Sequence, residues 1–340
     1  MIKSIEIGNI SKYRSELMGF AMLIVIMFHT GMEHRYLMWS FVKCGNVGVD
    51  FFLFLSGVGL WYSWSKTPDI KHFFSRRYLR VYPTWLIIVP FFYIPNYLNG
   101  GGYSRNIIDL IANITFNWSF WRIDDLTFWY VPALMMMYLF APLYMTLIRK
   151  HPMYKWLPIA AIIFCFIQQY VMPVHNVVGH IEIFWSRIPI FLLGINCGEL
   201  VKEKRTIDST AIWLIAIIFV MSLIVCVNFE MNWRGRYPQF LERMNYIPLT
   251  VTSILLLIEL FKHTSKWILK SLSFIGGISL EVYLLHLHFV LVRVQTLHLG
   301  FCITVVITSC ISLLAGWLLH KVIQYIISIL TSNPMKIITK

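Results

Sequence analysis

The chain has 340 residues, of which 58% are hydrophobic and 13% are charged, and its mean hydropathy is +0.67. Soluble domains average about 25% charged residues, so this composition excludes a soluble domain and indicates an integral membrane protein. The net charge of +13 suits orientation at an anionic membrane surface, and in so apolar a chain it does not indicate a nucleic-acid partner.

Ten segments are long and apolar enough to cross a membrane, which takes about 20 mostly apolar residues. They are residues 15–32, 47–65, 81–98, 128–148, 156–173, 184–201, 210–228, 246–262, 272–294 and 300–330. No small-residue cleavage site follows the first of them, so we expect that segment to be retained as a helix. The sequence thus predicts an all-α fold, a polytopic transmembrane helical bundle of about ten spans forming one domain over residues 1–340.

Basic residues gather on alternate connections between the spans and at both chain ends. This set holds 19 of the 29 Lys and Arg residues: Lys3, Lys12, Arg14, Lys66, Lys71, Arg76, Arg77, Arg80, Arg149, Lys150, Lys155, Lys202, Lys204, Arg205, Lys262, Lys266, Lys270, Lys336 and Lys340. By the positive-inside rule that side is cytoplasmic, and both termini lie on it. The longer connections, 99–127 and 229–245, then face outward, and their Trp, Tyr, Asn and Gly residues suit polar ligands such as sugars.

Two ionisable side chains lie near the outer ends of the first two spans, where burial is costly and function is a default hypothesis. They are His29 and Asp50. Because the two helices run antiparallel, we expect both side chains at a similar depth, with the carboxylate orienting the imidazole and stabilising its protonated form. The alternative is that each bonds separately to backbone or water.

Three arginines, Arg76, Arg77 and Arg80, lie at the opposite, cytoplasmic membrane face. Basic residues there also satisfy the positive-inside rule and bind lipid phosphates. However, Arg fills all three positions, and its planar fork is suited to bidentate phosphate contacts. The cluster therefore predicts an anionic ligand on the cytoplasmic side, with membrane lipid as the alternative.

The six cysteines indicate neither a disulfide framework nor a metal site. They show no Cys-x-x-Cys spacing, and all but Cys44 fall in apolar runs where a small soft side chain packs.

Five motifs in order carry a family resemblance. They are Gly48-Val49-Asp50-Phe51-Phe52 with Leu55-Ser56-Gly57, Phe73-Phe74-x-Arg76-Arg77-x-x-Arg80-x-Tyr82-Pro83, Trp129-Tyr130 with Tyr138 and Pro142, Arg187-x-Pro189-x-Phe191-x-x-Gly194, and Ile278-Ser279-x-x-x-Tyr283-Leu284-x-His286. With His29 on the first span, they resemble the acyltransferase 3 family of bacterial membrane acyltransferases, which typically modify surface polysaccharides. The likeness covers residues 14 to about 295.

The resemblance implies a ten-helix protein of the bacterial inner membrane that moves an acyl group, usually acetyl, from cytoplasmic acyl-coenzyme A to a hydroxyl at the outer face. Arg76, Arg77 and Arg80 would hold the coenzyme A phosphates, and His29 would act near the acceptor with Asp50 beside it. Arg187 would steady a developing oxyanion or a sugar. Acetyl-coenzyme A is then a donor substrate, and no permanently bound cofactor or metal is expected.

One position departs from the family pattern, which places an arginine eleven residues before the histidine. Here that position is Met18. Eleven steps of about 100° bring residue 18 onto the face of His29, and Arg14, one turn before Met18, can reach along that face. Either Arg14 replaces the family arginine or donor binding differs here, and we favour the first.

The remaining candidates have a plain alternative each. Trp129 and Tyr130 are expected to contact the acceptor or to belong to an interfacial aromatic belt. Glu281 and His286 are five residues apart, about 140° around a helix, and serve substrate binding or core hydrogen bonding. Arg122 and Arg187 are available for a carboxylated acyl group such as succinyl.

We therefore expect an O-acyltransferase of a cell-surface glycan or lipid-linked sugar, with His29 as general base and Asp50 orienting it. No Ser, Cys or Thr lies in a nucleophile motif, so direct transfer is the simpler assumption. The alternatives are a proton-coupled transporter or flippase of a sugar or lipid-linked intermediate without acyl chemistry, and a family member without catalysis, which Met18 invites. Membrane lipid, acyl-coenzyme A and the glycan are the expected partners, no nucleic acid is expected, and a homo-oligomer stays open.

Overall fold

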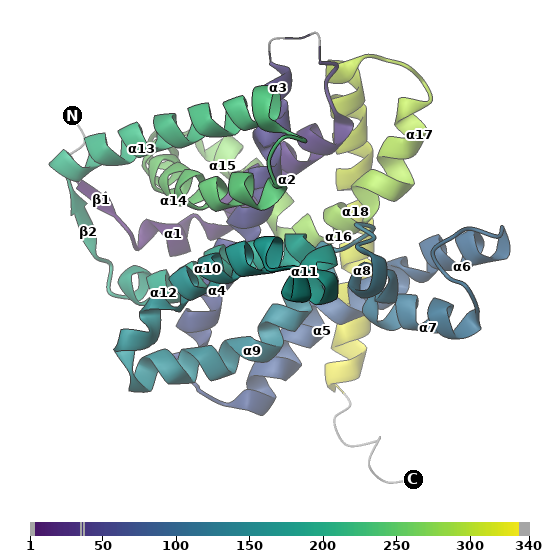
Figure 1. Ribbon diagram of the computed structural model, residues 1–340, viewed down its shortest axis with the longest axis horizontal. Helices are drawn as coiled ribbons and strands as arrows, with labels where there is room; N and C mark the ends of the chain where they lie inside the picture. The colour runs from purple at the N-terminus through teal and green to yellow at the C-terminus, as the bar shows by residue number, and fades with distance from the viewer. Residues whose placement is uncertain (1–3, 35, 37, 333–340) are drawn as a thin grey trace.

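The computed structural model describes residues 4–34, 36 and 38–332, and it consists almost entirely of helices (Figure 1). Three of the basic residues assigned to the cytoplasmic side, Lys3, Lys336 and Lys340, lie outside the described residues. The first half of the chain contains α1 (Asn9–Lys12), α2 (Arg14–Thr30), α3 (Trp39–Lys43), α4 (Gly48–Trp64), α5 (Ile70–Ile88), α6 (Pro90–Leu98), α7 (Ile107–Phe116), α8 (Trp118–Ile123) and α9 (Tyr130–Lys150).

The second half of the chain continues in the same way. Its helices are α10 (Leu157–Tyr170), α11 (Met172–Val178), α12 (Glu182–Lys202), α13 (Ser209–Asn228), α14 (Gln239–His263), α15 (Lys266–Gly277), α16 (Ser279–Leu285), α17 (Val292–Gln295) and α18 (Phe301–Ser332). Short 3₁₀ turns occur at Cys44–Val47, Pro152–Trp156 and Gly179–Ile181, and π-helical segments at Phe229–Trp233 and His286–Leu291.

Six helices of the described part are long and apolar enough to cross a membrane. They are Trp39–Trp64, Tyr130–Lys150, Met172–Lys202, Ser209–Trp233, Gln239–His263 and Phe301–Ile329. A seventh span is added if the pair Lys266–Gly277 and Ser279–Gln295, which bends by 64°, counts as one. These seven correspond to seven of the ten predicted segments, so the multi-span helical class is confirmed while the number ten stays a prediction.

The three other predicted segments fold as shorter or broken helices. The first, 15–32, forms α2, which has 17 residues. The segment 81–98 is divided between α5 and α6, because Pro90 begins a new helix after Val89. The segment 156–173 contains the 14-residue helix α10, preceded by the 3₁₀ turn. Apolar content alone therefore did not reveal where these helices stop.

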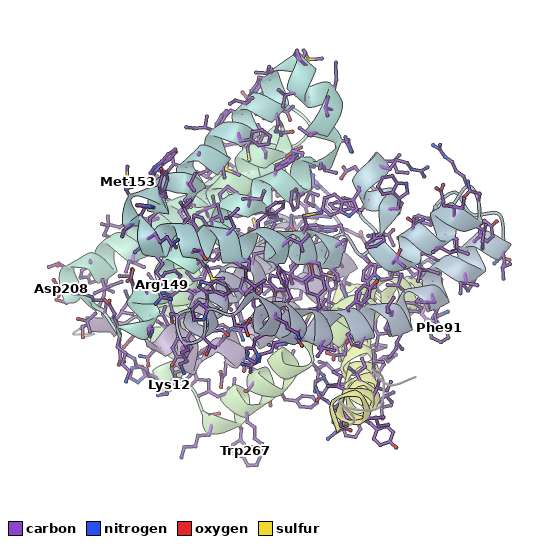
Figure 2. The ribbon with its side chains drawn as sticks, turned by 90° about the horizontal axis from the view of Figure 1, so that it is seen from below. Lys12, Phe91, Arg149, Met153, Asp208 and Trp267 are labelled. Atoms are coloured by element: carbon purple, nitrogen blue, oxygen red, sulfur yellow. The ribbon has the colours of Figure 1, made fainter. Side chains whose placement is uncertain are left out.

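The structure adds one feature that the all-α expectation lacked, a two-stranded antiparallel sheet. Strand β1 (Ser4–Glu6) pairs with β2 (Thr206–Asp208), with Ile5 opposite Ile207. The pairing ties the N-terminal segment to the connection between α12 and α13. Lys12 of the N-terminal segment, and Arg149 and Asp208 of two connections predicted to be cytoplasmic, lie toward the same end of the molecule in Figure 2, with Phe91 toward the other. Which side of the membrane that end faces stays a prediction.

Two helix crossings allow no side chain on the facing glycines. A Cβ at Gly19 of α2 would overlap the Leu272 carbonyl of α15, and one at Gly276 would overlap the Ser15 carbonyl. Likewise, a Cβ at Gly194 of α12 would overlap the Phe54 carbonyl of α4. Small residues let helix backbones approach closely where the hydrophobic effect gives little drive, as it does in lipid. These contacts fix α2 and α4, the two helices that carry His29 and Asp50.

Candidate active site

The first element of the site is a pair of histidines from opposite ends of the chain. Nδ1 of His29, in the last turn of α2, lies 3.0 Å from Nε2 of His286, and the ring centroids are 4.9 Å apart. His286 is 1% exposed and begins the π-helical segment that follows α16. π-helical turns occur frequently at functional sites because they break the ordinary side-chain phase of a helix. The structure thus gives His29 a partner that the sequence analysis had assigned to substrate binding.

Asp50 has a different partner from the one expected. Its carboxylate forms an ion pair with Arg187 of α12, and both side chains are buried. Arg187 also donates to the Asn46 side-chain oxygen at 3.1 Å, and its guanidinium lies 5.5 Å from the centre of the Tyr246 ring. A buried guanidinium requires a paired charge, and Asp50 supplies it. The expected contact between Asp50 and His29 is therefore replaced by a brace between α4 and α12.

This pairing also changes the interpretation of Arg187. Its charge is compensated by Asp50, so the structure does not present it as a free cation for an oxyanion or a carboxylated acyl group. Arg122, the other candidate for a carboxylated group, pairs with Asp109 at 3.3 Å. A succinyl donor therefore finds neither arginine unpaired.

The second element is an arginine-lined hollow on the side assigned to the cytoplasm, which we call the arginine hollow. It has about 1170 Å³ of space, and Arg14, Lys66, His72, Arg76, Arg77 and Arg80 are among the residues that line it. In the described part of the chain, no carboxylate forms an ion pair with any of these four arginines. A concave surface with unpaired guanidinium groups is suited to an anion with several phosphates.

Helix α5 supplies three of these arginines from the middle of its length. Asp69 caps the helix by accepting a hydrogen bond from the Lys71 amide at 2.9 Å, so the helix starts about two turns before the cluster. Burial lowers the pKa of the Arg77 guanidinium, and the neighbouring Arg80 and Arg76 lower it further. Crowded like charges of this kind favour a bound anion.

The third element is a narrower cavity between α2, α4, α5, α9 and α16, which we call the inner cavity. Arg14, Arg77 and Arg80 line both the arginine hollow and the inner cavity, so they lie where the two meet. At the His29 side, the lining includes Val25, whose carbonyl is 3.0 Å from His29 Nδ1, and Tyr283, whose ring lies 5.9 Å from that of His286. The two spaces therefore lead from the arginines toward the histidine pair.

Arg14 occupies the place that the departure at Met18 left in question. Met18 lines the inner cavity, and the Arg14 side chain reaches the same cavity from one turn earlier. Arg14 Nε donates to the Leu55 carbonyl at 3.3 Å. A Cβ on Gly59 would lie 3.4 Å from the Arg14 guanidinium, an ordinary van der Waals contact, so the guanidinium packs directly over Gly59. That Arg14 replaces the family arginine stays a prediction.

The predicted aromatic residues have separate positions. Tyr130 lines the inner cavity, its ring lies 5.3 Å from that of Tyr283, and its amide donates to the Tyr283 hydroxyl at 3.3 Å. Trp129 is 9% exposed and is not part of the cavity lining. The centre of its ring lies 6.4 Å from the centre of the Phe120 ring. Tyr130 is therefore placed beside the route from the arginines, whereas Trp129 presents little surface for a sugar to stack on.

Glu281 lies apart from the histidine pair. Its carboxylate is 2.8 Å from Nδ1 of His320 on α18, and it does not contact His286. His320 was not among the sequence candidates, because nothing in an apolar run of α18 indicates which helix it faces. Ser56 and Tyr138 were also missed as a pair: their hydroxyl oxygens are 2.8 Å apart in the inner cavity. Both had been noted only as parts of family motifs.

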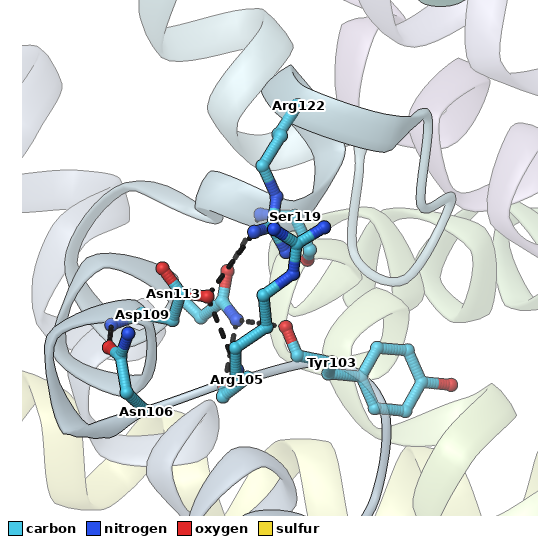
Figure 3. A network of polar contacts seen from close by, with 8 residues as sticks. Tyr103, Arg105, Asn106, Asp109, Asn113, Ser119 and Arg122 are labelled. Atoms are coloured by element: carbon cyan, nitrogen blue, oxygen red, sulfur yellow. Dashed lines mark hydrogen bonds and ion pairs between the residues drawn. The ribbon is translucent and has the colours of Figure 1, made fainter.

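The connection 99–127 is ordered by its own polar network (Figure 3). Asn113 donates to the Tyr103 carbonyl and the Ser104 hydroxyl, both at 2.9 Å, and accepts from the Ser119 amide at 2.7 Å. Asn117 donates to the Thr127 carbonyl at 2.7 Å. Asn113 and Asn117 are thus buried structural residues that hold this predicted outer connection together.

The described residues contain no group of three His, Cys, Asp or Glu side chains placed to hold a metal ion.

A helical membrane protein with a histidine pair, an inner cavity and an arginine-lined entrance is the class that the fold and site define. The family model of the acyltransferase domain called acyltransferase 3 matches residues 17–325, most of the chain. The chain belongs to this family of membrane acyltransferases. The comparison with curated proteins gives no match, and neither does the comparison with solved structures.

Proposed function

We propose that the protein transfers an acyl group, in the first place acetyl, from acyl-coenzyme A on the cytoplasmic side to a hydroxyl of a cell-surface glycan or lipid-linked sugar. The observation that supports this most is that Arg14, Arg77 and Arg80, which have no carboxylate partner among the described residues, line both spaces. The inner cavity also reaches Val25, whose carbonyl contacts His29. A long donor with phosphates at one end and a thioester at the other matches that arrangement.

The donor would bind with its phosphates in the arginine hollow. Arg76, Arg77 and Arg80 would hold the phosphate oxygens, and Arg14, at the junction, would hold the start of the pantetheine arm. The arm would then follow the inner cavity past Tyr130 toward His29. Acyl-coenzyme A is a substrate in this scheme, and no permanently bound cofactor is part of it.

The transfer itself would be direct. His29 takes the proton from the acceptor hydroxyl as its oxygen attacks the thioester carbonyl, the C–O bond forms, the C–S bond breaks, and the proton passes to the departing coenzyme A sulfur. The atoms balance without a covalent enzyme intermediate. Asp50 holds Arg187 and thereby the packing of α4 on α12, rather than touching the reacting atoms.

The same proposal places the chain in the inner membrane of a bacterium as a single multi-pass domain with about ten spans and both termini in the cytoplasm. The arrangement of Lys12, Arg149 and Asp208 toward one end supports a common side for the basic connections (Figure 2). The ordered connection 99–127 would then face outward and contribute to acceptor choice. Membrane lipid and the glycan are partners here, and the oligomeric state is open.

A proton-coupled transporter is the alternative, supported by the Asp50–Arg187 and Glu281–His320 pairs within the helices. It predicts dependence on a proton gradient and none on acyl-coenzyme A. The arginines without a carboxylate partner among the described residues support the acyltransferase over transport of a neutral sugar, which does not require them.

Calorimetry on the purified protein in detergent tests the donor site, with acetyl-coenzyme A as the probe. Arg76→Ala with Arg77→Ala is expected to weaken binding at least about 10-fold, since a hydrogen bond to a charged group contributes roughly 1.5–3 kcal/mol. The matched control is Lys266→Ala with Lys270→Ala, two exposed basic residues of α15 that line neither space. Unmodified, folded protein that binds no acetyl-coenzyme A would refute the acyltransferase proposal.

A further inference from the structure

We infer that His286 is a positioning residue that holds His29 in the one neutral tautomer able to act as a general base through Nε2. This inference rests on the proposed function and names the group that prepares its catalytic histidine.

The neighbours of His286 Nδ1 determine where the proton of that ring lies. Nδ1 is 2.8 Å from the Tyr283 carbonyl oxygen and 3.1 Å from the Val282 carbonyl oxygen. Carbonyl oxygens only accept hydrogen bonds, so a nitrogen facing two of them must carry the proton. In the neutral ring, Nε2 of His286 then carries the lone pair and can only accept.

The same reasoning applies to His29. Its Nδ1 is 3.0 Å from the Val25 carbonyl oxygen and 3.0 Å from Nε2 of His286. Both neighbours are acceptors, so Nδ1 of His29 carries the proton and donates it to them. The lone pair of neutral His29 is therefore on Nε2, which makes no hydrogen bond to the residues that the structure describes. That nitrogen is free for a hydroxyl of the acceptor.

A second histidine suits this position better than a carboxylate would. His286 is fully enclosed by the protein, and a neutral imidazole avoids burying a further charge without a cation to pair with it. When His29 takes the acceptor proton and becomes an imidazolium, its Nδ1–H bond to His286 becomes charge-assisted and shortens. The hydrogen bond between the two histidines is therefore stronger when His29 is protonated, as it is during the transfer.

His286, and not the histidine two residues later, contacts His29. His288 lies on the same segment, but its ring contacts Phe92 and Phe128, at 4.8 and 4.7 Å between centroids. It makes no hydrogen bond to His29 in the described part of the chain. His288 is therefore a matched control, a partly buried histidine of the same segment without the contact.

Two substitutions of His286 separate positioning from packing. His286→Gln keeps an acceptor oxygen near the place of Nε2, whereas His286→Asn has a shorter side chain that reaches only the place of Nδ1. Each protein is expressed in a bacterial host, and transfer is measured in inside-out membrane vesicles supplied with acetyl-coenzyme A that is radiolabelled in the acetyl group. Label is counted in the lipid-extractable and polysaccharide fractions, and protein amount and thermal unfolding in detergent are measured for each variant.

The expected result is a loss in kcat on the order of 10²-fold for His286→Asn, at unchanged KM for acetyl-coenzyme A, with most of the activity retained by His286→Gln and by His288→Asn. A merely structural role would instead give Gln and Asn equal losses or change KM and unfolding as well. Equal activity of His286→Asn and unmodified protein, while His29→Ala is inactive, would overturn this inference alone. Full activity of His29→Ala, or no transfer by the unmodified protein, would overturn the proposed function and this inference with it.

Discussion

The arginine hollow and the Asp50–Arg187 brace both contain guanidinium groups in an apolar protein, yet they differ in what surrounds the charge. Arg187 is fully buried and has a carboxylate, an amide oxygen and an aromatic ring as partners. Arg76 and Arg80 are exposed, line a hollow and have no carboxylate partner among the described residues. A compensated charge holds helices together, whereas an uncompensated charge in a concave surface is available to a ligand. Sequence alone gives the same residue type in both places.

The largest expected effect distinguishes the histidine, where transfer is proposed to occur, from the arginines that are proposed to bind the donor. His29→Ala removes the proposed general base and is expected to lower the rate of acetyl transfer by about 10²–10⁴-fold. Calorimetric affinity for acetyl-coenzyme A should stay unchanged, because the arginines that bind it are in another part of the molecule. Full transfer by a correctly inserted His29→Ala protein would show that the histidine is not the base.

A second test breaks the brace. Asp50→Ala leaves Arg187 buried without its counter-charge, which is expected to cost about 3–5 kcal/mol of stability. Asp50→Leu with Arg187→Met removes both charges and should recover most of that loss, as measured by thermal unfolding in detergent. The double variant also distinguishes a role of Asp50 in the transfer from a role in stability. If the stable double variant transfers acetyl at the normal rate, Asp50 acts only through packing. A single variant as stable as the unmodified protein would contradict the brace.

Much of this arrangement could be predicted from the sequence, since composition, hydropathy and basic connections are properties of single segments. The helices around 47–65, 128–148, 210–228 and 246–262, the family, and the arginine cluster followed from such local patterns. The partners of Asp50 and His29 did not, because periodicity shows which face a residue occupies and not which helix covers that face. Asp50 and His29 were paired on depth alone, and the structure gives each a partner more than 100 residues away.

The π-helical segment is a second reason for the missed pair. The spacing of Glu281 and His286 was interpreted with an ideal helical phase, but α16 ends at Leu285 and the geometry changes at His286. The β1–β2 pairing was missed for a related reason, since three-residue strands separated by about 200 residues carry no periodic signal.

A third, smaller effect concerns the crossing that positions α2, and therefore both Arg14 and His29. Gly276→Ala would force a Cβ against the Ser15 carbonyl and is expected to destabilise the protein by about 1–3 kcal/mol. The next residue provides the control: a Cβ at Gly277 meets nothing within 4 Å, so Gly277→Ala should be neutral or slightly stabilising. Thermal unfolding of the two variants in the same detergent checks this. Equal effects would mean that close approach of α2 and α15 is not what the glycine provides.

The smallest expected effect is a salt dependence that distinguishes the exposed arginines of the hollow from the buried Arg187. Raising the salt concentration from about 0.05 M to about 0.5 M shortens the Debye length from above 10 Å to below 8 Å, which screens exposed charges far more than buried ones. Binding of acetyl-coenzyme A to the arginine hollow should therefore weaken several-fold, while the unfolding temperature, to which the buried brace contributes, should change little. The Arg76→Ala, Arg77→Ala double variant should show a shallower salt dependence of binding, because two of the screened contacts are already gone. Binding that ignores salt would indicate that the donor is held by apolar contacts in the inner cavity, and the difference between compensated and uncompensated arginines would then have no role in donor recognition.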